Sequence, residues 1–137
     1  MTILIMIFAL TLKTFAPELR TIVIANAPKD QPYQAIWDAV CAVESAGNSL
    51  AYNSKENAIG IAQIRAIRIK DYNQRTGNDY SHQEMYDQEK AKIVFMYYAL
   101  QYSPNQRERI CREWNGGYKG MSKAQTKAYW NKVKSLL

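Results

Sequence analysis

Apolar residues recur at the spacing of an α-helix along most of the chain after Pro32. The first such stripe joins Ile36, Val40 and Val43, and it follows a proline that suits the first turn of a helix. Gly47 supplies the stop signal, because glycine commonly ends a helix. We therefore predict a first helix that begins near Pro32 and ends before Gly47.

The segment after this helix shows little periodicity. Residues 46–58 contain three asparagines, two serines and one glycine, which favours an irregular loop or a short β-hairpin. Regular spacing returns after Gly60, where Ile61, Ile64 and Ile67 share one side of a predicted second helix. We expect that helix to end before Gly77.

Capping residues predict three further helices. One is opened by Ser81 with Glu84, one is opened by Ser103-Pro104 and closed by Asn115-Gly116-Gly117, and one is opened by Ser122 with Gln125. We expect the first of these to be the longest helix, with apolar residues as far as Leu100 facing inward. The predicted fold class is mainly α, as a single helical domain with one irregular loop or β-hairpin after the first helix.

The first 25 residues form a separate segment. Ile3–Leu12 is a mostly apolar run of ten residues, too short to span a bilayer and typical of a secretory signal, with cleavage predicted after Ala25. No Lys or Arg precedes the run, which also fits an uncleaved apolar arm or a peripheral anchor. We therefore divide the chain into residues 1–25 and a domain of residues 26–137.

Basic residues are concentrated at the C-terminal end. The 137 residues have room for one core and carry a formal charge of +6. Residues 1–100 hold ten basic and ten acidic residues, whereas residues 101–137 hold eight basic and two acidic ones. Such an end suits an anionic polymer or a membrane surface, and equally a solvated helix face. No helix-turn-helix pattern is present, so we expect no nucleic-acid partner.

Several kinds of chemistry are excluded by residue counts. Two cysteines, Cys41 and Cys111, and one histidine, His82, are too few for a zinc site, so no metal is expected. The six glycines are scattered and form no phosphate-binding loop, so no cofactor is expected either.

One acidic residue lies on an apolar stripe. Glu44 follows Val40 by four residues and Ile36 by eight, which places its carboxyl on the buried face near the helix end. Burial and the negative end of the helix dipole both raise the pKa of a carboxyl group. A raised pKa suits a general acid, while the alternative is a carboxylate at the rim that accepts a hydrogen bond.

Five short segments occur in an order and spacing that resemble a known family. They are Glu44-Ser45, Ser54, Gly60-Ile61-Ala62-Gln63, Trp114-Asn115-Gly116-Gly117 and Tyr129. Together they resemble the soluble lytic transglycosylases, whose domain is lysozyme-like, over about residues 33–135. Two positions depart from the family pattern: Trp114 stands where a tyrosine is usual, and Ile61-Ala62 replaces Leu-Met.

The resemblance implies a role for each matched residue. Glu44 is the single catalytic acid and base. The residues implied in substrate binding are Ser45, Ser54, Gln63, Trp114, Asn115 and Tyr129. Trp114 can stack on a sugar ring but lacks the hydroxyl of the usual tyrosine. The resemblance also places Glu44 and Trp114 at one cleft, so Cys41 and Cys111, each three residues earlier, lie beneath it as free thiols or as a disulfide.

The resemblance implies cleavage of peptidoglycan with a 1,6-anhydro-muramoyl product. Hydrolysis instead needs a second acid, and Glu56 is the candidate because it is the only acidic residue between Glu44 and Asp71. A non-catalytic peptidoglycan-binding or assembly module on the same fold is a further alternative. The expected location is periplasmic or extracellular, including a phage lysis or virion protein, and the basic C-terminal region is expected to touch the membrane or cell wall.

Overall fold

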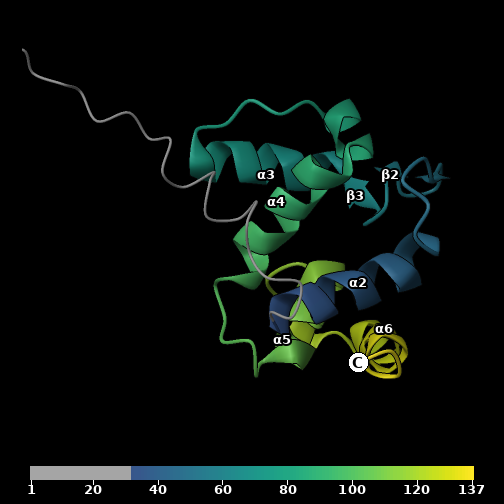
Figure 1. Ribbon diagram of the computed structural model, residues 1–137. Helices are drawn as coiled ribbons and strands as arrows, with labels where there is room; N and C mark the ends of the chain where they lie inside the picture. The colour runs from purple at the N-terminus through teal and green to yellow at the C-terminus, as the bar shows by residue number, and fades with distance from the viewer. Residues whose placement is uncertain (1–31) are drawn as a thin grey trace, which may run out of the picture.

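The computed structural model describes residues 32–137, and the apolar run with its expected cleavage site lies outside them. Five α-helices and a small sheet follow one another along this part of the chain (Figure 1). The elements are α2 (Pro32–Ser45), β1 (Tyr52–Asn53), β2 (Ala58–Ile59), β3 (Ile64–Arg65), α3 (Ala66–Thr76), η1 (His82–Tyr86), α4 (Gln88–Ala99), α5 (Arg107–Gly116), η2 (Gly120–Ser122) and α6 (Ala124–Lys134). The predicted fold class, mainly α, is confirmed.

The sheet follows α2 directly and has three short antiparallel strands in the order β1-β2-β3. Tyr52 pairs with Ile59, and Ala58 pairs with Arg65. The prediction of an irregular loop or hairpin is thus correct in its hairpin form, with β3 as an additional strand. Figure 1 shows α2 running toward this sheet, so the end of the helix and the strands lie at one side of the molecule.

The second predicted helix begins later than expected. Ile64 belongs to β3, α3 starts only at Ala66, and the side chain of Ile67 is 69% exposed. Positive φ angles at Gly60 (77°) and Gln63 (49°) explain the error, because a right-handed helix cannot contain them. The predicted end is confirmed, since Gly77 adopts a left-handed conformation after Thr76.

The Ser81 capping box exists, but it opens the short 3₁₀ helix η1. Asp87 begins α4 by accepting hydrogen bonds from the backbone N–H groups of Glu89 and Lys90. Helix α4 has 12 residues against 14 in α2, so the expectation that it is the longest helix is wrong. Leu100 is exposed because α4 ends at Ala99.

The last two helices also start later than their proposed caps. Gln106 precedes α5, and no side chain caps its first turn. Ser122 lies in η2, where its hydroxyl donates to the carbonyl of Lys119 at 2.8 Å and does not cap α6. The predicted closure of α5 is confirmed, because the helix ends at Gly116 and Gly117 has a φ of 75°.

The core lies between α2, α4, α5 and α6. Phe95 of α4 is fully buried at its centre, with ring centroids 5.2 Å from Trp37 and 5.0 Å from Trp114. These contacts join α2, α4 and α5 through aromatic rings, which stabilise such cores through area burial and edge contacts. Among residues 32–137, no helix is both long and apolar enough to cross a membrane.

Candidate active site

Glu44 lies in the last turn of α2, where the helix meets a cleft of about 700 Å³. The cleft is lined by the end of α2, by β3 and α3, and by the C-terminal end of α5 with Gly117, which follows it. Four residues predicted for the site line it, namely Glu44, Gln63, Trp114 and Asn115. Segments far apart in the sequence therefore meet around one carboxyl group.

Protein atoms surround most of the Glu44 carboxyl, which keeps a small opening to the cleft. This burial raises the pKa of Glu44 from its ordinary 4.5 to about 7. The hydroxyl of Tyr129 and the cations of Arg65 and Arg68 oppose the increase, while the charge of Glu56 adds to it. At neutral pH a large share of Glu44 carries a proton, as a general acid requires.

Tyr129 reaches Glu44 from α6. Its hydroxyl is the one buried side-chain polar atom within residues 32–137 that has no hydrogen-bond partner. Burial and the neighbouring Glu44 carboxyl both raise the pKa of Tyr129 well above its ordinary value. The hydroxyl therefore lies close enough to the Glu44 carboxyl to affect its pKa, and no other group among the described residues competes for its proton.

Gln63 sits at the turn between β2 and β3. Its side-chain amide donates to the carbonyl of Gly60 at 3.0 Å and to that of Ala51 at 3.3 Å. These bonds hold the loop that carries Gln63 against the sheet and leave the amide oxygen unbonded among the described residues. That oxygen is the atom of Gln63 available to a ligand in the cleft.

The two predicted serines are outside the cleft lining. The hydroxyl of Ser45 donates to the carbonyl of Ile61 at 2.7 Å, which ties the end of α2 to the loop before β3. Ser54 is exposed in the turn between β1 and β2. Ser45 therefore positions the chain around Glu44, and Ser54 lies on the hairpin tip.

Trp114 forms one wall of the cleft. Its ring is buried against Phe95 and Tyr98, with centroid separations of 5.0 and 6.3 Å. Asn115 follows it, and its backbone carbonyl accepts a hydrogen bond from Arg65 at 3.0 Å. This bond joins β3 to the end of α5 across the cleft.

Sequence reasoning missed the basic lining of the cleft. The cations there are Arg65, Arg68, Lys70, Arg75 and Lys123. A signal was present in the sequence: Arg65 and Arg68 come soon after Gln63 and are three residues apart, and Asp71 and Arg75 continue from Arg68 at helical spacing. A charged face that directly follows a substrate-binding motif is a candidate part of the same site.

Glu56 also lines the cleft, from the β1–β2 hairpin. Its carboxylate forms an ion pair with Arg65 at 3.6 Å, and its side chain is 55% exposed. The second acid that the hydrolytic alternative needs is therefore at the same cleft as Glu44, although it is paired and solvated.

Both cysteines are buried free thiols. Burial raises the pKa of each to about 12, so they behave as small apolar side chains. Residues 32–137 contain no group of three or more His, Cys, Asp or Glu side chains that could hold a metal ion.

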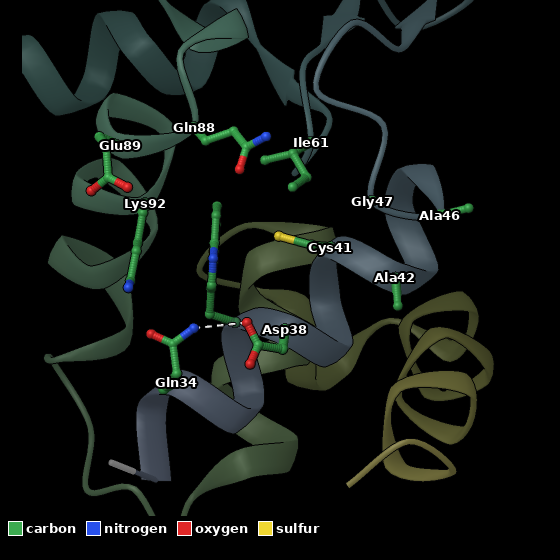
Figure 2. A pocket seen from close by; sticks show the side chains of 11 residues that line it. Gln34, Asp38, Cys41, Ala42, Ala46, Gly47, Ile61, Gln88, Glu89 and Lys92 are labelled. Atoms are coloured by element: carbon green, nitrogen blue, oxygen red, sulfur yellow. Dashed lines mark hydrogen bonds between the residues drawn. The ribbon is translucent and has the colours of Figure 1, made fainter. Parts of the chain in front are cut away.

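Cys41 lies at a second cavity of about 450 Å³ between α2 and α4. Figure 2 shows its thiol beside Ile61 and Gln88, with the Gln34 amide donating to Asp38 at 2.7 Å. None of the predicted site residues lines this cavity. This cavity therefore lies apart from the predicted site residues.

The raised pKa of Glu44 has a consequence for stability. In the unfolded chain the carboxyl ionises near its ordinary 4.5, and in the folded chain near 7. Folding therefore favours the protonated form, and stability falls as the pH rises from about 4.5 through 7. We expect Glu44→Gln to remove this fall and to be more stable than the wild type by up to about 3 kcal/mol at pH 8.

Urea unfolding between pH 5 and pH 8 measures this difference. The exposed Glu89→Gln on α4 is the matched control and should keep the wild-type pH dependence. Parallel curves for the wild type and Glu44→Gln would show that the Glu44 carboxyl ionises normally in the folded state.

Comparison with known proteins gives one match. The family model described as the transglycosylase SLT domain matches residues 22–136. No curated protein and no solved structure matches the chain. The match spans all the described elements, including the helix of Glu44, the sheet and the cleft, and the mainly helical architecture with its small sheet is consistent with that lysozyme-like family.

Proposed function

The chain belongs to the transglycosylase SLT domain family, and on that premise we propose that it is a peptidoglycan lytic transglycosylase. Members of the family are lytic transglycosylases that act on peptidoglycan. The bond proposed for cleavage is the β-1,4 bond between N-acetylmuramoyl and N-acetylglucosaminyl units. The observation that carries the proposal is Glu44, whose carboxyl faces a 700 Å³ cleft with its pKa raised to about 7.

One carboxyl group suffices for the proposed reaction. Protonated Glu44 donates its proton to the bridging oxygen, and the bond from that oxygen to C1 of the muramoyl unit breaks. The Glu44 carboxylate then accepts the proton of the C6 hydroxyl of the same sugar, whose oxygen forms a new bond to C1. The product is a 1,6-anhydro sugar, no water is consumed, and Glu44 returns to its protonated state.

The other site residues support this cycle in distinct ways. Tyr129 is proposed to donate to the Glu44 carboxylate in the middle of the cycle, when that group bears its charge, and its position beside Glu44 supports this role. Gln63 and Asn115 offer polar atoms along the cleft, and Trp114 offers part of an apolar wall for a sugar ring. Ser45 ties the end of α2 to the loop before β3, while Ser54 is proposed to meet the glycan at the hairpin tip.

The proposed substrate implies a place of action. Peptidoglycan lies outside the cytoplasmic membrane, so a periplasmic or extracellular location follows from the activity, and a phage lysis or virion protein would meet the same polymer. The basic C-terminal region is proposed to contact the cell wall or membrane surface around that substrate. Residues 1–25 as a signal or apolar arm remain a prediction from the sequence.

A hydrolytic muramidase is the second candidate, because Glu56 lines the same cleft. The Arg65 pair and the solvent exposure of Glu56 favour a structural role on the hairpin over activation of a water molecule. We therefore expect Glu56→Gln to keep at least about one third of the wild-type rate, since it removes only an exposed pair. The rate of release of soluble fragments from purified peptidoglycan measures this, and a loss of roughly 100-fold would favour the hydrolase.

Product analysis tests the proposal itself. The full chain is incubated with purified peptidoglycan, and the released muropeptides are analysed by mass spectrometry beside a Glu44→Gln control. The proposal predicts muramoyl ends that lack one water, absent from the control. Reducing ends would make the protein a hydrolase, and retained binding without release would identify a non-catalytic peptidoglycan-binding or assembly module.

A further inference from the structure

A smaller cavity of about 180 Å³ adjoins the cleft behind Trp114. The two cavities share Arg68, Arg75, Trp114 and Tyr118 in their linings, so these side chains form the boundary between them. The remaining wall is built mainly from aromatic and polar side chains, including Tyr97, Tyr98, Tyr102, Gln101 and Glu113. We call this cavity the side pocket.

Arg68 stands at the boundary as a mostly buried cation. Its guanidinium carbon lies 4.6 Å from the centroid of the Tyr98 ring and 4.7 Å from that of the Trp114 ring. Its Nη2 donates to the backbone carbonyl of Trp114 at 2.6 Å. Burial lowers the pKa of Arg68 from its ordinary value, although the group stays charged at any physiological pH.

No carboxylate within residues 32–137 lies within 4.0 Å of this guanidinium. Four other arginines do have such partners: Arg65 with Glu56, Arg75 with Asp71, Arg109 with Glu113 and Arg112 with Glu108. The negative charge of Asp71 acts on Arg68 only from beyond this distance. A buried charge without a direct ion pair is costly, so the position of Arg68 favours an anion.

Two nitrogens of Arg68 remain available to that anion. Nε and Nη1 make no hydrogen bond within the described chain. Both nitrogens also keep some exposure to solvent. Tyr129 Oη is the one fully buried side-chain polar atom in residues 32–137 that lacks a hydrogen-bond partner, so these two unbonded nitrogens are not fully buried. Nε and Nη1 belong to one planar group, whose N–H donors suit the two oxygens of a carboxylate.

We propose that Arg68 binds a carboxylate carried by a side branch of the substrate, with the side pocket holding part of that branch. The inference rests on the proposed function, because it assumes that a glycan strand occupies the cleft. In peptidoglycan the carboxylate comes from the lactyl group of a bare muramoyl unit or from the peptide attached there. Both sources offer the same chemistry to Arg68, and the experiment below separates them.

The test measures binding and so does not depend on cleavage. The Glu44→Gln chain is titrated calorimetrically with three soluble glycan preparations: strands with peptides, strands whose peptides have been removed to leave lactyl carboxylates, and strands whose carboxylates have been converted to methylamides. We expect Kd to be roughly tenfold higher for the methylamide strands than for at least one of the charged ones. The charged preparation that binds more tightly identifies the source of the carboxylate.

Arg68→Met in the same background removes the cation. This variant should bind the charged and methylamide strands with the same Kd, close to the Kd of the parent chain for methylamide strands. Arg68→Lys should restore part of the preference for charged strands, because it keeps a charge. The exposed Arg107→Met is the control and should keep the full preference, because Arg107 contacts no residue of the side pocket through an ion pair or hydrogen bond. Thermal unfolding of each variant establishes that the proteins compared are folded.

Two outcomes would overturn the inference. One is an equal Kd of the parent chain for charged and methylamide strands. The other is an increase in Kd on Arg68→Met by the same factor for charged and for methylamide strands. That result would give Arg68 only the structural role of holding Trp114. If the wild type releases no fragments while the carboxylate preference is present, the proposed catalysis fails and the binding site stands.

Discussion

Glu44→Gln is expected to lower the rate of peptidoglycan cleavage by at least about 1000-fold. Glutamine keeps the shape of the side chain but can neither donate the proton to the bridging oxygen nor take one from the C6 hydroxyl. Both halves of the proposed cycle use this one carboxyl, so no other group can replace it in part. Initial rates of fragment release at pH 6 and pH 7 measure the effect.

The stability of Glu44→Gln and its binding of glycan strands show whether the loss of activity comes from misfolding. Glutamine at position 44 removes the cost of burying a charge, so the variant should be at least as stable as the wild type above pH 7. It should also bind glycan strands as tightly as the wild type, because the change lies in the reacting group. A variant that kept a tenth of the wild-type rate would show that Glu44 is not the single acid and base.

Gly60→Ala is expected to destabilise the protein by about 3 kcal/mol or more. Gly60 has a φ of 77°, and a Cβ built there would lie 2.1 Å from the backbone carbonyl oxygen of Met85. A backbone atom of η1 cannot move aside as a flexible side chain would. The loop from β2 to β3 must therefore shift, and Gln63 with it.

Gly77→Ala is the control for this substitution. Gly77 has a similar φ of 75°, but a Cβ there would meet no atom within 4 Å. It should cost only about 1 kcal/mol, the penalty for an L-residue in the left-handed region. Urea unfolding of both variants compares the two costs, and equal values would mean that the contact with Met85 does not hold the loop in place.

The sequence pattern predicted an element correctly where residues within that element determine its structure. The α2 stripe of Ile36 and Val40 predicted both the helix and the side on which Glu44 lies. Ile36 and Val40 are fully buried in the structure, and Glu44 is partly buried at the cleft. Gly77 and Gly117 were recognised as helix ends because glycine alone takes the required backbone conformation easily.

Distant contacts explain the elements that were mispredicted. The turn at Gly60 depends on close packing against Met85, which the isoleucine spacing around it does not reveal. The segment before α6 is fixed by Arg112, which donates to the carbonyls of Met121 and Lys123, and α6 begins after it without a side-chain cap. Neither contact is visible in the sequence near the element that it fixes.

The candidate site was predictable in its centre and not in its lining. Glu44, Gln63 and Trp114 are carried by short motifs, and the cleft brings them together. Arg68 was not predicted as a site residue, because the rings that cover its guanidinium belong to Tyr98 and Trp114, which lie 30 and 46 residues further along the chain. A sequence shows the charge of such a residue, whereas the absence of a carboxylate partner is a property of the fold.

The proposed mechanism requires that Glu44 acts alone and that no water enters the product. Digestion of peptidoglycan by the full chain in water labelled with heavy oxygen tests this most directly, with mass spectrometry of the muramoyl ends. We expect 1,6-anhydro ends without the label, because the oxygen that closes onto C1 comes from the same sugar. Labelled oxygen at C1 of the first products would contradict it and would assign the activation of water to a second group, beginning with Glu56.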